Sequence, residues 1–411
     1  MKRKGTGINT ARRKKKSKKK EDDENENTSG MVVDTYRSQL PDLVVERILS
    51  LISTRLAARA SILSKQWARL WLSVPVIDLD EDGATPREDQ RSKFMNFMRR
   101  YLKLRDKDTC IDKLRLRMRN LGGTVTITKW LTFAVERNVK ELDICLVRTK
   151  SGQRYKPLYL SKTLLLKSTK SLTVLKLENV IVDLESTDGI DLPSLKTMTL
   201  KFVEFRTRLP FLRLLSRCPL LEYLLLNGCT WPSSQLKLSS SSLKSLQLAP
   251  DSSQIISKVK AVNLESFIIH CFHDILPFIK NISSRSCQKI RHLEFGYSTE
   301  MRSSWFEDLD LRFPHLERLI LRRCQEPLGE RIKISSEHLK YFLLFSDSLM
   351  SGLLCMSTNF PNLSEAVIIL GSNVPRHISM DPIRRMLQLR DFLGQFDCSR
   401  KVSLHVSDAE V

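Results

Sequence analysis

The sequence lacks the features of membrane-spanning and secreted proteins. No run approaches the roughly 18 apolar residues that cross a bilayer, and the charged N-terminus is not followed by the apolar segment of a secretory signal. Nine cysteines are scattered without a C-x-x-C pair, which is typical of reduced thiols. We therefore expect a soluble protein that is made in the cytosol and does not contact a membrane.

Motifs for catalysis or for metal binding are also missing. There is no G-x-x-x-x-G-K-[ST] loop, no G-x-S-x-G elbow and no H-E-x-x-H helix. His270 and His273 flank Cys271 but have no second ligand pair, so we predict no metal site. The sequence predicts a non-catalytic protein without a cofactor.

Positive charge is abundant. The first 20 residues hold eleven Lys/Arg, residues 21–26 return five negative charges, and about +16 of the net charge of +22 therefore lies in the rest of the chain. A basic charge on the rest of the chain favours acidic partners, either an acidic protein surface or nucleic acid.

Residues 1–33 have almost no large apolar groups, which predicts disorder. Two basic clusters match the charge pattern of a nuclear import signal read by importin, and a solvated or RNA-attracted tail is the alternative. We predict the nucleus as the location, with the cytosol as the second choice. The import residues would be Lys2, Arg3, Lys4, Arg12, Arg13, Lys14, Lys15 and Lys16.

The segment 34–79 has a dense helical pattern. Apolar residues from Leu43 to Ile52 recur at helical spacing, Leu56 to Leu63 suggest a second short helix, and Ser64 can cap a third. A segment of this length is too short for a self-sufficient core. It must pack on a partner or on the rest of the chain.

Five short motifs in this segment resemble the F-box of plant F-box proteins. They are Leu40-Pro41, Ile48-Leu49-Ser50, Leu63-Ser64-Lys65, Trp67 and Leu70-Trp71. Ser53 and Leu56 depart from the family's usual proline and aspartate. The resemblance implies binding to a Skp-family adaptor, and through it to a cullin-RING ligase, by Leu40, Pro41, Ile48, Leu49, Leu63 and Trp67.

An apolar triplet at offsets 0, 3 and 5 recurs every 21 to 26 residues, which is the period of leucine-rich repeats. Four prolines, Pro193, Pro219, Pro314 and Pro361, each lie two residues before a triplet, where we expect an extended approach to a strand. Cys229 and Cys324 share offset 8, a buried position where the chain turns away. The triplets begin at Leu172, Leu195, Leu221, Leu243, Leu264, Ile290, Leu316, Leu339 and Leu363, and Ile111, Val139 and Tyr155 extend the series toward the N-terminus.

Period-two alternation puts offsets 3 and 5 in the core and offsets 2, 4 and 6 on a shared concave sheet. Arg and Tyr are enriched among residues that dominate binding energy. Solvated side chains with no partner are the alternative. The predicted target-binding residues are Tyr223, Arg318, Arg322, Tyr341 and Phe345, and the other predicted face residues include Lys176, Glu178, Thr199, Lys201, Asn227, His270, His292, Glu294 and Leu343.

The order of these parts resembles the plant F-box/leucine-rich-repeat family, without a convincing copy of the C-terminal FBD domain that many members carry. We predict an α/β fold with a tail (1–33), a three-helix F-box (34–79), a linker (80–105), a leucine-rich-repeat solenoid (106–370) and an unassigned segment (371–411). The resemblance implies a substrate receptor of an SCF-type ubiquitin ligase. Two alternatives are a nuclear nucleic-acid-associated scaffold and a receptor that also holds a small acidic ligand.

Overall fold

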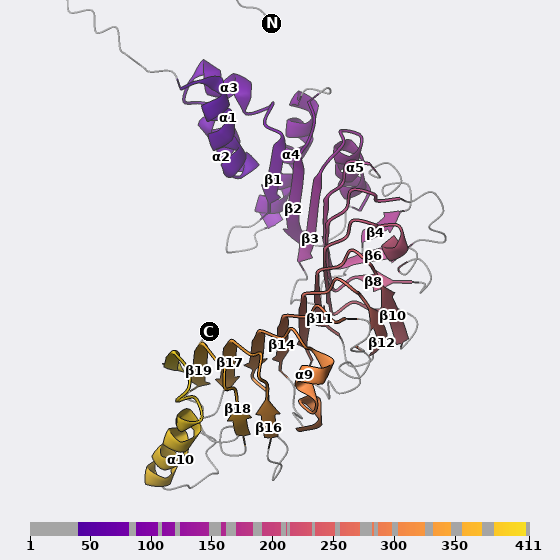
Figure 1. Ribbon diagram of the computed structural model, residues 1–411. Coiled ribbons are helices and arrows are strands. Elements are labelled where there is room, and N and C mark those ends of the chain that lie inside the picture. Colours follow the sequence, from indigo (N-terminus) through magenta and orange to yellow (C-terminus); the bar gives the residue numbers. More distant parts are fainter. Residues whose placement is uncertain are drawn as a thin grey trace, which may run out of the picture. The chain divides into compact units, whose positions relative to one another are not determined.

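The fold is taken from a computed structural model of the chain (Figure 1). The predicted tail with its import residues lies outside the part that the structure describes. No helix in the described part is long and apolar enough to cross a membrane. The structure describes residues 40–81, 88–105, 109–119, 124–147, 158–161, 170–183, 191–206, 211, 214–231, 235–250, 255–271, 282, 287–297, 303–324, 332–346, 356–371 and 382–407.

Three short helices open the described chain, as the sequence predicts: α1 (Asp42–Leu51), α2 (Thr54–Ala60) and α3 (Lys65–Leu70). Ser64 caps α3 by accepting a hydrogen bond from the Trp67 amide. Leu63 follows α2 instead of lying within it. The helices share a small core made of Val45, Leu49, Ala57, Leu70 and Val74.

A parallel sheet follows, and its strands pair in the order of the sequence (Figure 1). This confirms the predicted mixed α/β architecture of N-terminal helices followed by a repeat-built parallel sheet. The thirteen strands found among the described residues are β1 (Val76–Asp80), β2 (Lys113–Arg119), β3 (Glu141–Val147), β5 (Val174–Glu178), β7 (Thr197–Lys201), β9 (Tyr223–Asn227), β11 (Ser245–Ala249), β13 (Ser266–His270), β14 (His292–Gly296), β15 (Arg318–Arg322), β17 (Tyr341–Ser346), β19 (Glu365–Gly371) and β20 (Lys401–Ser407).

The predicted register of the triplets is confirmed in the main sheet. In β5, for example, Leu175 and Leu177 are buried, whereas Lys176 and Glu178 are only half-buried on the other side. The proposed extension at Tyr155 is wrong, because Leu158 and Leu160 belong to β4 (Leu158–Ser161), which pairs with β6 in a separate small sheet. A triplet pattern alone cannot distinguish two sheets that pack on one core.

In the described residues, three small sheets and several helices pack on the buried side of the main sheet and share one apolar core with it. We call the opposite side of the main sheet, which carries offsets 2, 4 and 6, the open face. The remaining elements are β6 (Val180–Asp183), β8 (Glu204–Phe205), β10 (Gln235–Ser239), β12 (Ile255–Lys260), β16 (Ile332–Ser335), β18 (Met356–Asn359), α4 (Glu88–Leu104), α5 (Thr124–Val135), η1 (Ser303–Trp305), α9 (Leu309–Arg312) and α10 (Pro382–Gly394).

The prolines before the triplets lie in turns and not in extended segments. Leu195 donates its amide hydrogen to the Leu192 carbonyl, which places Pro193 at the second position of a β-turn. Leu221, Leu316 and Leu363 close the same turn around their prolines. The fixed φ of proline suits that position, and its missing N–H costs nothing there. The prediction of the position was right and that of its conformation was wrong.

A left-handed residue follows several strands at offset 7. The amide of each such residue donates to a carbonyl at or next to the end of the following strand, as from Phe202 to Asn227 (2.7 Å) and from Arg323 to Phe345 (2.6 Å). The chain then turns away from the sheet, and Cys229 and Cys324 at offset 8 are buried as predicted. The residues with this conformation are Asn179, Phe202, Gly228, Tyr297 and Arg323.

The predicted linker and C-terminal segment both contain regular structure. Within 80–105, α4 buries Phe94, Met98 and Tyr101 in the main core, because their spacing puts them on one helical face. Within 371–411, α10 is followed by β20, which pairs with β19. The other predicted domain limits stay predictions.

Candidate functional site

Exposed apolar side chains are concentrated on the first two N-terminal helices and in the turn between α2 and α3. Leu43 is 79% exposed, and Leu51 and Ile62 are also largely exposed. The small core takes one face of α1 and of α2. Leu43, Val44, Leu51 and Leu56 lie on the remaining faces of these two helices, and Ile62 and Leu63 lie in the turn that follows α2. An exposed apolar surface of this kind marks an interaction site. We define the apolar helix set as Leu43, Val44, Leu51, Leu56, Ile62 and Leu63.

The six predicted adaptor-binding residues separate into two groups. Leu40, Pro41 and Leu63 are exposed and Ile48 is half-buried. Leu49 is 1% exposed and Trp67 packs on the small core, so both hold the helices together. Five members of the apolar helix set were missed, because helical spacing does not say which face the core occupies.

The two departures from the family pattern have structural consequences. Ser53 has a φ of −61°, close to the value that proline fixes, and its hydroxyl accepts a hydrogen bond from the Leu56 amide to cap α2. Ser53 therefore keeps the path of the chain and adds a cap. Leu56 places an exposed apolar side chain where the family has a carboxylate, which enlarges the apolar helix set.

Asp42 joins the first and third helices. Its carboxylate accepts hydrogen bonds from Gln66 Nε2 (2.7 Å) and from the Arg69 guanidinium (2.5 Å). The hydrogen bond from Gln66, with the charge of Arg69, holds the pKa of Asp42 below its ordinary value. The carboxylate also suits the positive end of α1, as the sequence predicts.

The open face starts with a charged row on its N-terminal strands. Asp78, Arg115, Asp143 and Lys176 lie side by side in register on β1, β2, β3 and β5. Arg115 binds Asp78 at 3.0 Å and reaches Asp80 at 3.7 Å. Burial raises the pKa of Asp143 despite Lys176 and Arg115 nearby. Alternating signs along the row largely compensate one another.

A cavity of about 470 Å³ opens on this charged part of the open face. Its lining combines the cations Arg117, Lys176 and Lys201 with the carboxylates of Asp143 and Glu178. Desolvation raises the pKa of Cys145, also in the lining, to about 12, so its thiol stays protonated. The described residues contain no group of metal ligands here or elsewhere.

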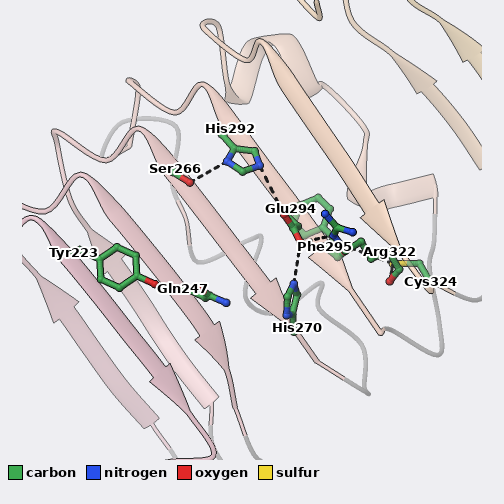
Figure 2. A network of polar contacts seen from close by, with 9 residues as sticks. All are labelled: Tyr223, Gln247, Ser266, His270, His292, Glu294, Phe295, Arg322 and Cys324. Carbon is green, nitrogen blue, oxygen red and sulfur yellow. Dashed lines mark hydrogen bonds and ion pairs between the residues drawn. The ribbon is translucent and has the colours of Figure 1, made fainter. Parts of the chain in front are cut away.

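A polar network crosses the middle of the open face (Figure 2). The Glu294 carboxylate on β14 contacts His270 Nε2 at 3.1 Å and accepts a hydrogen bond from Arg322 Nε at 2.8 Å. Burial would raise the pKa of Glu294, but the hydrogen bonds from His270 and Arg322 and the charge of Arg322 keep that pKa below its ordinary value. Burial lowers the pKa of His292, whose Nδ1 contacts the Ser266 hydroxyl. Glu294 therefore ties three strands together.

The predicted target-binding residues all lie on the open face, in two places. Tyr223 donates to Gln247 on the neighbouring strand (3.1 Å). The Arg318 guanidinium lies 4.0 Å from the Tyr341 ring centre on the next strand. Phe345 is half-buried on the same strand as Tyr341.

One contact on the open face and the burial of two of its residues were not predicted. Arg323, at the left-handed offset 7, stands 5.0 Å from the Phe345 ring centre. The sequence could have pointed to Arg323, because it directly precedes Cys324, which was predicted to be buried. Glu294 and Leu343 lie on the open face, but their side chains are buried there.

Family comparisons agree with both parts of the chain. Residues 37–78 match the F-box domain. Residues 127–295 match the family described as "FBD-associated F-box protein At5g56370, LRR repeats".

Similar proteins come from Arabidopsis thaliana. The chain is 33% identical to F-box/FBD/LRR-repeat protein At5g22700 over 53% of its own length and 47% of the relative. It is 32% identical to F-box/LRR-repeat protein At4g14103, over 47% of the chain and 50% of the relative, and 34% identical to F-box protein At3g59000, over 52% and 43%. The match thus spans about half the length of these relatives.

Proposed function

We propose, from the premise that this chain belongs to the plant F-box/leucine-rich-repeat proteins, that it is the substrate-recognition subunit of an SCF-type ubiquitin ligase. F-box domains generally bind Skp-family adaptors, and proteins of this family are generally non-catalytic. In this role the chain supplies proximity only: it raises the effective concentration of a target lysine near the conjugating enzyme.

The apolar helix set carries the proposal. Six large apolar side chains are exposed within a segment of fewer than 25 residues, although the same segment has its own small core. Burying one such side chain against a partner contributes about 1.5–3 kcal/mol. An adaptor that covers several of them would be bound firmly.

Co-purification with a Skp-family adaptor tests the proposal. In the variant Leu43→Asp/Leu63→Asp, both side chains are exposed, so the helices should keep their fold while adaptor binding weakens by more than about 100-fold, as expected for about 3 kcal/mol or more. Leu40→Ala/Pro41→Ala should weaken binding in the same direction. Leu311→Asp on α9, where the leucine is 78% exposed, is the matched control and should bind normally. Absence of binding by the wild type, or equal binding by the double aspartate variant, would contradict the proposal.

The open face is the proposed contact surface for the target protein. Tyr223, Arg318, Arg322, Tyr341 and Phe345 all belong to it, and aromatic and Arg side chains frequently dominate binding energy at interfaces. The stacking of Arg318 on Tyr341 orients the guanidinium before binding, which lowers the entropic cost of a contact.

Nuclear import by the basic tail is a separate proposal. Importin would bind the clusters that include Lys2 to Lys4 and Arg12 to Lys16. Neutralising Arg12 to Lys20 should abolish nuclear accumulation of a fluorescent fusion. An unchanged distribution would contradict it, and adaptor binding by the same variant should remain normal.

A further inference from the structure

The last strand of the main sheet has an unpaired edge. The Lys401 amide donates to the Ser364 carbonyl on the side of β19 (3.1 Å). Backbone groups of successive strand residues point to opposite sides, so those of Val402, Leu404 and Val406 point away from β19. Among the described residues, no strand pairs with that side of β20.

The same strand exposes apolar side chains that elsewhere belong to the core. Val402, Leu404 and Val406 lie in register with Ala366, Ile368 and Leu370, each of which is fully buried. On β20 they are 43%, 41% and 65% exposed. The row of core side chains on β19 thus continues onto β20, where these side chains stay partly exposed.

Apart from Lys401 at its first position, nothing in the strand itself protects this edge. Natural edge strands are commonly blunted by proline, by a bulge or by an inward-pointing charge. The segment Lys401–Ser407 has neither a proline nor a charge in the row of Val402, Leu404 and Val406, and its pairing with β19 is regular.

The order of residues in β20 is self-complementary. In an antiparallel pair of two copies centred on Leu404, each Leu404 faces its equivalent and Val402 faces Val406 of the other copy. Ser403 then faces His405, and Lys401 faces Ser407, so no two like charges oppose each other. The apolar rows meet on one side of the joined sheet and the polar rows on the other.

We propose that two copies of this chain associate through β20, which pairs antiparallel with its equivalent around a two-fold axis at Leu404. The contact is isologous, so it closes as a dimer and leaves no further edge of the same kind. The contact pairs the backbones of the two β20 strands and also brings their apolar side chains together on one side of the joined sheet. This inference is independent of the proposed ligase role.

Sedimentation equilibrium of the 411-residue chain tests the association. The wild type should be dimeric at tens of micromolar, and Leu404→Lys, which sets two charges against each other at the axis, should be monomeric. Leu311→Lys, at an exposed leucine away from the edge, should stay dimeric. A monomeric wild type, or a Leu404→Lys variant that dimerises equally well, would overturn the proposal.

Disulfide trapping tests the register. Directly opposed residues have Cα atoms about 5.5 Å apart, within the range that a disulfide bridges, whereas residues four positions out of register are about 13 Å apart. Leu404→Cys should therefore cross-link with itself on mild oxidation, and Val402→Cys or Val406→Cys alone should not. A mixture of these two variants should yield the crossed dimer. Cys110 and Cys398 are exposed, so the variants are made with both replaced by serine. Equal cross-linking by Val406→Cys alone would overturn the register.

Discussion

The two edge strands of the main sheet, β1 and β20, differ in how their unpaired backbone groups are covered. At the first edge, the Asp78 amide of β1 donates to the Thr54 hydroxyl on α2 at 2.9 Å, and Thr54 is buried. At the last edge, β20 has no such partner among the described residues and exposes Leu404. A repeat protein needs a cap where its stacking stops. The N-terminal helices thus cap the first edge through α2, whereas the last edge is uncovered among the described residues, and it is the edge through which we propose that two copies associate.

The core beneath the last strands is nevertheless well covered. Phe396 stacks on Phe342 (5.7 Å between ring centres) and contacts Phe392 edge-on (5.2 Å). Phe360 belongs to the same cluster. The core face is therefore covered as far as β19, whose Ala366, Ile368 and Leu370 are fully buried, whereas in the described residues β20 leaves both its apolar side chains and its backbone edge partly uncovered.

The largest effect should come from removing the aromatic cover. Phe396→Ala should cost about 3–5 kcal/mol of unfolding free energy, because a fully buried ring is lost and a cavity remains. Hydrogen exchange should increase in β19 and β20 and stay unchanged in β1. Leu387→Ala on α10, where the leucine is exposed, should change stability by at most about 0.5 kcal/mol. Uniform acceleration across the whole sheet would show that the two edges are not independent.

A smaller effect should follow from opening the first edge. Thr54→Val keeps the shape but removes the acceptor of the Asp78 amide, which should cost about 1–3 kcal/mol. Amide exchange at Asp78 should become faster, which NMR can measure. Ser50→Ala removes only a hydrogen bond within α1 and serves as the control. If Asp78 exchanges as slowly as before, α2 does not protect the edge in the way described.

The smallest effect concerns pH. The pKa of Asp42 is lowered in the folded state, so its stabilisation of the α1–α3 contact is present above the ordinary pKa and is lost as the pH falls through the folded value. Acid should therefore loosen the first edge, and Asp42→Asn should remove that pH dependence. Asp391→Asn on α10 is the control. An NMR titration in which Asp42 shows an ordinary pKa would contradict this.

Much of the fold could be predicted because the repeat is simple. The triplets identified the strands, since stacked repeats bury the same positions again and again. Pro193 and its equivalents marked the approach to each strand, but that approach was predicted to be extended and is a turn, because proline fits both an extended segment and the second position of a β-turn. Leu158 was assigned to the wrong sheet because two sheets with the same alternation share one core.

The candidate sites were predictable by region and less so by residue. The F-box motifs marked the right helices, but Leu49 and Trp67 proved to be core, while exposed Leu43 and Ile62 were missed. On the open face, Arg318 and Tyr341 could be assigned by counting offsets. Their mutual stacking depends on neighbouring strands and could not be read from either strand alone.

Local periodicity was enough to predict the three N-terminal helices, the repeat period and the face on which each residue of the main-sheet strands lies. The left-handed conformation at offset 7 depends on contacts between neighbouring repeats. Asn179 and Gly228 suit it, whereas Phe202, Tyr297 and Arg323 adopt it at a cost of about 1–2 kcal/mol each. The hydrogen bond from each of these amides to the next strand offsets that cost, and its acceptor lies some twenty residues further along the chain.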